Sequence, residues 1–222
     1  MATVAEKIQR LQGAIVSVLA DMIENRDKIT GGHVERTSQY VKILIKEMKA
    51  RGLYAEETRD WNVDAFVSSA RLHDVGKITI SDLILNKPGK LTDDEFETIK
   101  THAFEGERII CKIIAQTYDV DDNFLQNAKL IAGNHHERWD GTGYPRKLKG
   151  ENIPLQGRIM AIVDVYDALV SDRPYKKAFS HEKAVEIIKD DAGKHFDPKI
   201  ADVFLDIKDK FMVKETRTSV SM

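Results

Sequence analysis

The sequence is poor in the features that would mark a secreted, membrane or nucleic-acid-binding protein. It contains one cysteine, Cys111, in 222 residues, so an internal disulfide is excluded and a reducing cytoplasm is the simplest compartment. A formal charge of -2 supplies no basic field that would attract nucleic-acid polymers or anionic membranes. No apolar run approaches the ~18 residues that cross a bilayer, and residues 1–10 lack the apolar core of a signal peptide. We therefore expect a soluble, cytoplasmic protein.

Amphipathic helical patterns make up most of the chain. Hydrophobic residues account for 42% and charged residues for 32% of the sequence, a balance typical of a globular domain. There are neither internal repeats nor a convincing alternation of apolar and polar residues, so we predict an all-α fold. Eight helices are expected. Four have predicted ranges: 5–24, 62–76, 124–137 and 159–172. The other four have predicted starts: after Gly31 and Gly32, at Thr92, at Ser180 and at Asp197.

Capping signals and apolar spacing predict details of these helices. Asn62, Ser180 and Asp197 are expected N-caps, and Thr92 with Glu95 forms an expected capping box. Buried positions are expected at Val34, Val41, Ile45 and Met48 of the second helix. In the fourth they are expected at Phe96, Ile99, His102 or Ala103, Gly106, Ile109 and Ile113. Gly76 is expected in a left-handed stop, Cys111 as a small apolar filler, and His181 and His195 at the surface.

The first helix carries apolar residues with the spacing of a short coiled coil. Its spacings of 3, 4, 3 and 4 join Ile8, Leu11, Ile15, Val18 and Met22. Two interpretations stay open: the seam packs on the core of its own domain, or it forms a dimerisation or signal-input helix. We divide the chain into this N-terminal helix (1–26), a domain (27–210) and a polar tail (211–222).

Several polar residues fall where the apolar pattern predicts burial: His33, His73, Asp74, His102, Asp164 and the adjacent pair His135 and His136. Burying an unpaired carboxylate costs several kcal/mol, and coordination of a cation removes that penalty. A single buried histidine is more often a satisfied core residue than a ligand, but this number of them is hard to explain in that way. Imidazole and carboxylate groups without thiolates suit iron, manganese or zinc, so we predict a metal site.

The stretch HHERWDGTGYP, at residues 135–145, ends a helical pattern and begins a long irregular segment. Gly141, Gly143 and Pro145 require a sharp turn, and such a loop is more often functional than idle. Asp140 is expected to orient the loop and Glu137 to support the neighbouring histidines.

Together these motifs resemble a known family. His33, His73–Asp74 and Asp164 follow the H…HD…D pattern of the HD phosphohydrolase superfamily. HDVGK (73–77), NKPGKLT (86–92), His102, HHERWDGTGYP (135–145) and DVYDALVSDRPYKKA (164–178) resemble the HD-GYP family over roughly residues 24–205. The resemblance implies an HD-type helical bundle with a GYP loop and a two- or three-metal centre. It also implies hydrolysis of the bacterial second messenger cyclic di-GMP.

The resemblance assigns ligands by position. It implies that His33, His73, Asp74 and Asp164 hold one ion and that His102, His135 and His136 hold a second, with Asp74 bridging the two. Members with a third ion place a glutamate one helical turn before the first histidine, where this sequence has Ile29. We therefore expect two divalent ions, iron or manganese before other transition metals.

The expected reaction is hydrolysis of a phosphodiester. A water bridging two cations ~3.5 to 4 Å apart is ionised near neutral pH and can attack phosphorus, giving linear pGpG and, in a second cycle, GMP. Asp74, Lys77 and Asp167 are the expected catalytic residues, with Asp167 positioning the attacking water. The expected substrate-binding residues are Lys77, Tyr144, Arg173 and Lys176, with Tyr144 against a guanine.

Other functions stay open on the same residues. Cyclic GMP-AMP is an alternative substrate, because the residues that select the base cannot be located from sequence. A non-catalytic module that binds a nucleotide or a partner and signals through the first helix is a second alternative. A dNTP triphosphohydrolase-like enzyme needs only H…HD…D and leaves the HHE…GYP stretch unexplained. A homodimer through the first helix and an upstream receiver or sensory domain are the expected partners besides cyclic di-GMP.

Overall fold

The computed structural model describes residues 3–26, 32–117, 123–172 and 177–212. Within these ranges it contains helices and no β-strand, which confirms the predicted all-α fold; the extended pairing is limited to one isolated bridge between Ala192 and Phe196. The elements are α1 (Val4–Arg26), α2 (His33–Ala50), α3 (Ala55–Thr58), α4 (Val63–Ala70), η1 (Val75–Thr79), α5 (Asp82–Leu85), α6 (Asp93–Gln116), α7 (Asn123–Asn134), η2 (Gly150–Asn152), α8 (Leu155–Val170), α9 (His181–Asp190), α10 (Pro198–Asp206) and η3 (Lys208–Phe211).

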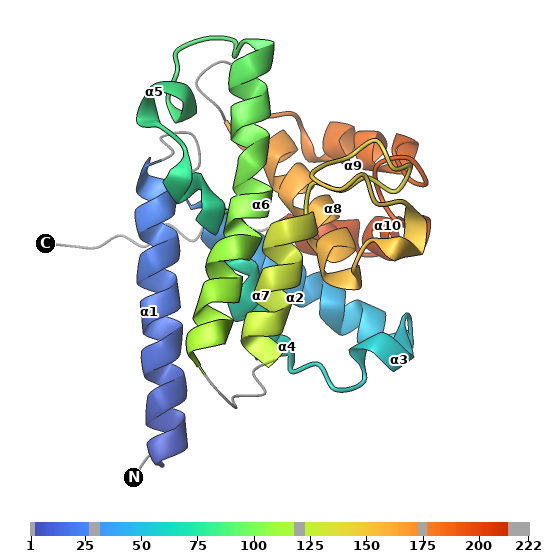
Figure 1. Ribbon diagram of the computed structural model, residues 1–222. Helices are drawn as coiled ribbons and strands as arrows, with labels where there is room; N and C mark the ends of the chain where they lie inside the picture. The colour runs from blue at the N-terminus through green and yellow to red at the C-terminus, as the bar shows by residue number, and fades with distance from the viewer. Residues whose placement is uncertain (1–2, 27–31, 118–122, 173–176, 213–222) are drawn as a thin grey trace, which may run out of the picture.

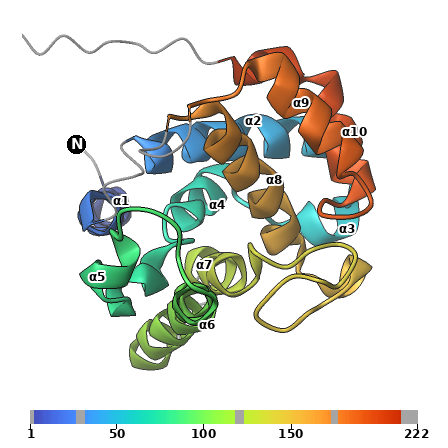
Figure 2. The ribbon, with the colours of Figure 1, turned by 90° about the horizontal axis from the view of Figure 1, so that it is seen from above.

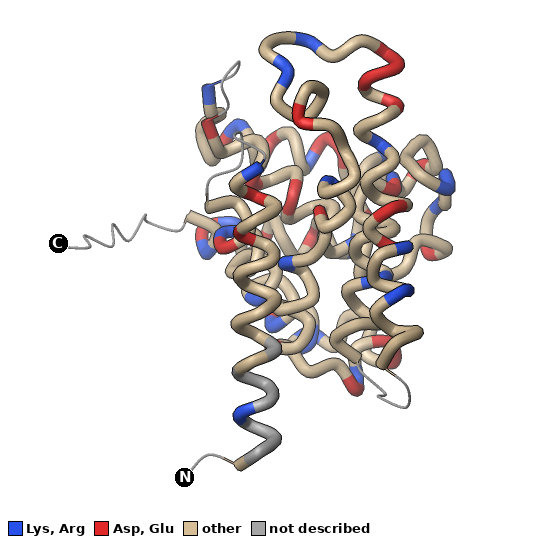
Figure 3. Tube along the Cα trace, turned by 60° about the vertical axis from the view of Figure 1, so that its left-hand side comes forward, with Lys and Arg blue, Asp and Glu red and all other residues tan. Residues whose placement is uncertain are grey.

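The helices form a bundle around α2, α4, α7 and α8 (Figures 1 and 2). Helix α6 packs along α7 and η1, while α9 and α10 cover α8 on the opposite side. Helix α1 lies at the edge of the bundle, against α2, α4 and η1. Basic and acidic residues are interspersed along the trace (Figure 3), in keeping with the small net charge. None of the described helices combines the length and the apolar character that a membrane crossing demands.

The core confirms the buried face predicted for α2. Val34, Val41, Ile45 and Met48 are all buried, and the last three pack in the main cluster with Tyr166 and other residues of α8 and α10. Phe211, at the end of η3, is also in this cluster. The tail predicted from residue 211 therefore begins too early, because Phe211 closes the core instead of leaving it.

The predicted caps are present in the structure. The side chains of Asn62, Ser180 and Asp197 accept backbone N–H groups at the starts of α4, α9 and α10. Thr92 and Glu95 form the reciprocal capping box of α6. These contacts connect residues at most three positions apart, so local sequence is enough to predict them.

Helix α6 buries the middle of its predicted face, at His102, Ala103 and Gly106, but not the two ends. Phe96 and Ile113 are 46% and 38% exposed, while His102, Ala103, Gly106 and Ile110 are buried. The prediction that Phe96 and Ile113 are buried is wrong. Helix α6 packs through its small residues against η1 and α7, where the backbones approach closely. Cys111 is exposed, so its predicted role as a core filler is wrong.

Gly76 shows the same close packing. Its φ is not positive, so the predicted left-handed stop is wrong. Helix α4 ends at Ala70, and Gly76 lies in η1, where a Cβ atom would overlap the carbonyl oxygen of His102 in α6. Glycine is required here by the approach of two backbones and not by backbone conformation.

Helix α1 packs on the domain through residues outside the predicted seam. Val16, Ala20 and Ile23 are buried. The described seam residues Leu11, Ile15, Val18 and Met22 are 63%, 52%, 57% and 61% exposed. The interpretation that the seam packs on its own domain is wrong, because the structure buries the neighbouring stripe of the helix instead.

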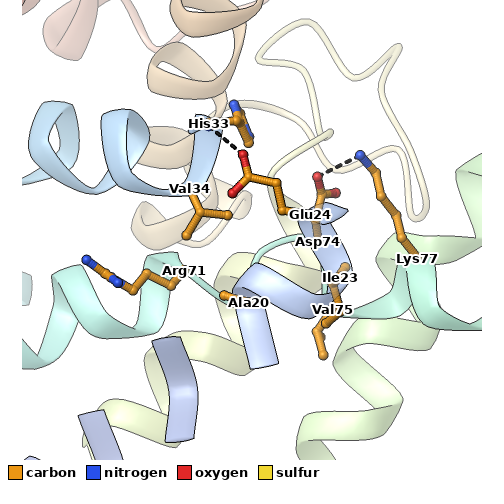
Figure 4. Close-up of a pocket in the computed structure, with 9 residues that line it drawn as sticks. All are labelled: Ala20, Ile23, Glu24, His33, Val34, Arg71, Asp74, Val75 and Lys77. Atoms are coloured by element: carbon orange, nitrogen blue, oxygen red, sulfur yellow. Dashed lines mark hydrogen bonds and ion pairs between the residues drawn. The ribbon is translucent and has the colours of Figure 1, made fainter. Parts of the chain in front are cut away.

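A side chain from α1 caps the start of α2. The N-cap position of α2 is Gly32, with φ of 74°, which has no side chain to offer. The half-buried Glu24 of α1 takes this role: its Oε1 accepts the backbone N–H of His33 at 2.6 Å (Figure 4). A carboxylate at a helix N-terminus also complements the helix dipole. Helix α1 is thereby tied to the first residue of α2.

This cap predicts a measurable stability effect. Glu24→Ala is expected to lower the free energy of unfolding by about 1 kcal/mol, because the N-terminus of α2 loses a side-chain acceptor. Glu24→Gln keeps an oxygen acceptor and should lose less. Urea denaturation followed by circular dichroism measures both, with Asn25→Ala, a change at the exposed neighbouring residue, as the control. Equal stabilities of the Glu24→Ala and Asn25→Ala variants would contradict the capping role.

Candidate metal centre

Imidazole and carboxylate groups from five segments meet inside the bundle. They form two groups whose ligand atoms lie within 4.8 Å of one another, namely His33, His73 and Asp164, and Asp74, His102, His135 and His136. We call these the first and second clusters. Every residue predicted as a metal ligand belongs to one of them, although the residues are spread over more than half of the chain.

Each segment presents its ligand at a helix end or on the buried face of a helix. His33 begins α2, His102 lies on the buried face of α6, and Asp164 lies within α8. Helix α7 ends at Asn134, just before His135 and His136. Their ring centroids are 4.0 Å apart, so both rings reach the same place, as neighbouring residues can do only beyond a helix end.

In the first cluster, two ring nitrogens face each other. Nε2 of His33 lies 3.1 Å from Nε2 of His73. The other ring nitrogens are engaged: Nδ1 of His33 lies 2.8 Å from the Asp167 carboxylate, and Nδ1 of His73 lies 2.9 Å from the carbonyl oxygen of Ala70. Both acceptors require a proton on Nδ1, so in each neutral imidazole the lone pair is on Nε2. This arrangement fits a cation that is bound by both Nε2 atoms.

The second cluster repeats this arrangement. Nε2 of His102 lies 3.4 Å from Nε2 of His135. Their Nδ1 atoms lie 2.6 Å from the carbonyl oxygen of Ile99 and 3.1 Å from that of Ile131. Carbonyl groups that hold the Nδ1 proton and aim Nε2 inward are the usual outer partners of metal-binding histidines.

Asp74 connects the two clusters. Its Oδ2 lies 3.3 Å from Nε2 of His73, and its Oδ1 lies 3.3 Å from Nε2 of His102 and 3.8 Å from Nε2 of His135. Burial alone would raise the pKa of this carboxyl, but the charges of Lys77 and His73 outweigh it and hold the pKa of Asp74 well below its usual range. Asp74 is therefore an anion with one oxygen toward each cluster.

The histidines of the second cluster are held in the form that binds metal. Burial, together with the imidazoles of His73 and His102, lowers the pKa of His135 to about 3. Burial also lowers the pKa of His102, and burial with the neighbouring His135 lowers the pKa of His136. In the first cluster burial opposes protonation, yet the negative Asp74 raises the pKa of His73. Neutral imidazoles are available as ligands at pH 7 in the second cluster.

Asp167 does not face the space between the clusters. Its Oδ2 accepts from Nδ1 of His33 at 2.8 Å, and its Oδ1 accepts from Nε of Arg36 at 2.6 Å. The side chain is buried behind His33, so the predicted role of positioning an attacking water is wrong. Asp167 orients His33 instead, and Arg36 holds Asp167. Sequence reasoning missed Arg36, whose only signal is its position three residues after His33 on the same helix.

The irregular segment that follows α7 and contains the Gly-Tyr-Pro sequence at 143–145, which we call the GYP loop, covers the second cluster. The Tyr144 ring lies 4.7 Å from the His136 ring. Asp140 accepts the backbone N–H of Thr142 at 2.9 Å, which confirms that it orients the loop. Gly141 has a φ of 85°, and a Cβ atom on Gly143 would overlap the backbone of Arg138, so both glycines are needed by the loop, as predicted.

Glu137 is buried but does not support the histidines as expected. Its carboxylate accepts the backbone N–H groups of Arg146 at 2.7 Å and Leu148 at 3.0 Å. It therefore fixes the far side of the GYP loop. Backbone groups of a loop that the sequence leaves irregular could not be identified as its partners beforehand.

Hollows lie on two sides of the clusters. On the α1 side, Glu24, Asp74 and Lys77 line a small cavity, and Nζ of Lys77 lies 2.8 Å from Oδ2 of Asp74 (Figure 4). On the other side, a groove of about 790 Å³ runs between α6 and the GYP loop and reaches His136. His195 lines this groove and is not a simple surface residue, contrary to the prediction.

The remaining expected residues lie away from the clusters or outside the described ranges. His181 contacts the hydroxyl of Tyr166 through Nδ1 at 2.8 Å, and its Nε2 is buried without a hydrogen-bond partner, so it is not a plain surface residue either. Ile29, Arg173, Pro174 and Lys176 lie outside the described residues.

Comparison with known proteins agrees with this arrangement. The profile of the HD-domain family matches residues 17–200. A cyclic di-GMP phosphodiesterase of Vibrio cholerae is 49% identical over 199 residues, which cover 90% of this chain and 40% of the relative. A 3'3'-cGAMP-specific phosphodiesterase of the same organism is 38% identical over 198 residues, covering 89% of this chain and 35% of the relative. The chain thus spans less than half the length of these relatives.

A solved structure shares the fold. The crystal structure of a cyclic GMP-AMP-specific phosphodiesterase from Vibrio cholerae superposes with a TM-score of 0.56 and 18% identity, over 87% of this chain and 48% of that one. The resemblance carried by His33, His73–Asp74 and Asp164 is confirmed, and the chain belongs to the HD-domain family.

Proposed function

We propose that this chain is a metal-dependent phosphodiesterase that hydrolyses cyclic di-GMP to linear pGpG and then to GMP. The observation that carries the proposal is the pair of clusters: in each, two imidazole Nε2 atoms lie 3.1 or 3.4 Å apart beside an oxygen of Asp74. The names of relatives such as the one that is 49% identical support cyclic di-GMP as the substrate. Because those proteins are more than twice as long, their activity is carried to this chain as a proposal.

We propose that the clusters hold two divalent ions. His33, His73 and Asp164 with Oδ2 of Asp74 would hold one ion. His102, His135 and His136 with Oδ1 of Asp74 would hold the other. Imidazole and carboxylate donors without thiolates suit iron or manganese. When bound, such ions neutralise phosphodiester oxygens and lower the pKa of water, which is the chemistry that phosphodiester hydrolysis requires.

The residues of the chain act on the substrate around these ions. Lys77 lies beside Asp74 with its side chain 16% exposed, where its ammonium can bind a phosphate oxygen and give a proton to the leaving ribose oxygen. Tyr144 covers His136 and offers its ring to a guanine. Arg173 and Lys176 are proposed to bind phosphate from the family resemblance alone. Asp167 with Arg36 keeps the tautomer of His33 that has a free Nε2.

Cyclic GMP-AMP is the second candidate substrate, because a relative named for it is 38% identical. The first named relative is 49% identical and is named for cyclic di-GMP, so we favour cyclic di-GMP. A reaction in the cytoplasm agrees with the single, exposed cysteine. Chromatography of the products formed from each dinucleotide, with kcat/KM for both, decides between the substrates.

Metal removal and one substitution test the activity together. Protein purified anaerobically and loaded with Fe(II) or Mn(II) is expected to bind about two ions per chain and to convert cyclic di-GMP to pGpG and GMP. Chelation should abolish turnover, and Asp74→Ala should reduce both metal content and turnover to background because both clusters lose a ligand. Circular dichroism should stay helical, and Asp60→Ala, at an exposed position, is the control. Full activity after exhaustive chelation would refute the proposal.

A substitution at Lys77 tests whether this residue acts on the substrate or helps to hold the metal ions. Lys77→Ala is expected to lower kcat by about a hundredfold, the usual effect of losing a general acid, with metal content unchanged. Lys90→Ala, at an exposed position of the following loop, should have no effect. Elemental analysis beside steady-state kinetics measures both quantities. Loss of an ion from the Lys77→Ala protein would mean that Lys77 holds the centre together and does not act on the substrate.

The exposed seam of α1 supports a homodimer. Leu11, Ile15, Val18 and Met22 have a/d spacing and are each more than half exposed, so a second copy of the same helix would bury them in a two-fold coiled coil. In a longer polypeptide, such a helix would connect the domain to an upstream receiver or sensory domain. The greater length of the relatives supports this arrangement.

A charge placed in the seam tests the dimer. Ile15→Asp is expected to raise the dimer dissociation constant by about tenfold or more, because a buried, unpaired carboxylate opposes association. Asp21→Ala, at an exposed polar position of α1, should leave it unchanged. Sedimentation equilibrium measures both. A wild-type protein that is monomeric at high micromolar concentration would contradict the proposal without bearing on the metal centre.

A further inference from the structure

The groove between α6 and the GYP loop adjoins the second cluster. It is about 790 Å³ in volume, large enough for a nucleotide, and His136 of the second cluster is one of the residues that line it. Helix α6 contributes Phe96, Lys100 and Phe104, which follow one another at intervals of four residues and therefore share one face. The loop contributes Arg138 and Tyr144.

The groove contains aromatic rings that the fold does not bury. Phe96 and Phe104 are 46% and 53% exposed, whereas His102 and Ala103, on the neighbouring face of α6, are buried. Exposed phenylalanine rings beside a polar loop add little to the core. Flat apolar rings along a groove are the surfaces on which nucleobases stack.

Positive charge accompanies these rings. Nζ of Lys100 lies 4.8 Å from the centre of the Phe96 ring and 5.7 Å from that of Tyr144. Its ion pair with Glu97, at 2.5 Å, is partly exposed, so a phosphate can replace that carboxylate. Arg138 lies in the loop, where its Nε donates to Thr142 at 3.1 Å. Rings and cations together fit a ligand that is both aromatic and anionic.

We propose that this groove binds one nucleoside half of the cyclic dinucleotide, with its purine stacked on Phe104 and the uncleaved phosphodiester paired with Lys100 and Arg138. The inference rests on the proposed function, which puts the other phosphodiester at the clusters. A cyclic dinucleotide has two phosphodiesters and two bases. When one phosphodiester lies at the clusters, the other half of the molecule must therefore lie outside them. The groove is lined by both His136 and Tyr144, so it can hold that second half of the substrate next to the second cluster.

The groove is tested by substitutions that leave the clusters unchanged. Phe104→Ala and Lys100→Ala are each expected to raise the KM for cyclic di-GMP about tenfold, the usual effect of losing one stacked base or one phosphate contact. Phe104→Trp keeps a stacking surface and should restore binding. Ile113→Ala, at an exposed apolar residue of α6 outside the groove, is the matched control. Hydrolysis of bis(p-nitrophenyl) phosphate, which has no nucleobase, should be unaffected by all four substitutions.

A binding measurement separates this inference from the proposed function. The phosphorothioate analogue of cyclic di-GMP, which resists hydrolysis, is titrated calorimetrically into metal-loaded wild-type and Phe104→Ala proteins. Tenfold weaker binding by the Phe104→Ala protein supports the groove even if the wild type does not turn over cyclic di-GMP, in which case the proposed hydrolysis alone fails. Unchanged affinity, no binding by the wild type, or an equal loss with bis(p-nitrophenyl) phosphate overturns the groove assignment.

Discussion

The structure depends on imidazole nitrogens that face one another inside the bundle. Nε2 of His33 and His73, and Nε2 of His102 and His135, approach within 3.1 and 3.4 Å while their Nδ1 atoms keep the protons. In neutral imidazoles the lone pairs of two such nitrogens repel each other, and a cation held by both would turn this repulsion into attraction. Metal binding should therefore contribute to the stability of the bundle as well as to its chemistry.

Asp74 is the residue through which the parts of the centre are coupled. Its two oxygens face different clusters, and Lys77 pairs with it from the next turn of the chain. The backbone around it is held by the close contact between Gly76 and α6, which also carries His102. Any shift of η1 against α6 therefore changes the distances within both clusters at once. Packing between two backbones sets the geometry of the site.

Two elements approach the centre from opposite sides. Helix α1 caps His33 through Glu24 and exposes an apolar seam at the edge of the molecule. The GYP loop covers His136 with Tyr144 and forms one wall of the groove. Helix α1 is tied to the first residue of α2, and so to the first cluster, by the Glu24 hydrogen bond and by its packing on α2, α4 and η1, whereas the groove reaches the second cluster. The exposed seam and the groove are therefore separate surfaces on two sides of the same clusters.

The sequence by itself determined the helical class, the caps at Asn62, Thr92, Ser180 and Asp197, and the family, because caps and apolar spacing act over a few residues and the HD motifs are local. It could not determine which stripe of α1 is buried, or that the ends of the predicted face of α6 are exposed, because an apolar pattern does not identify the surface that it packs against. The partners of Asp167, Glu137 and Glu24 were decided only by tertiary structure. A carboxylate takes its role from the donors that folding brings to it, and those lie up to 134 residues away.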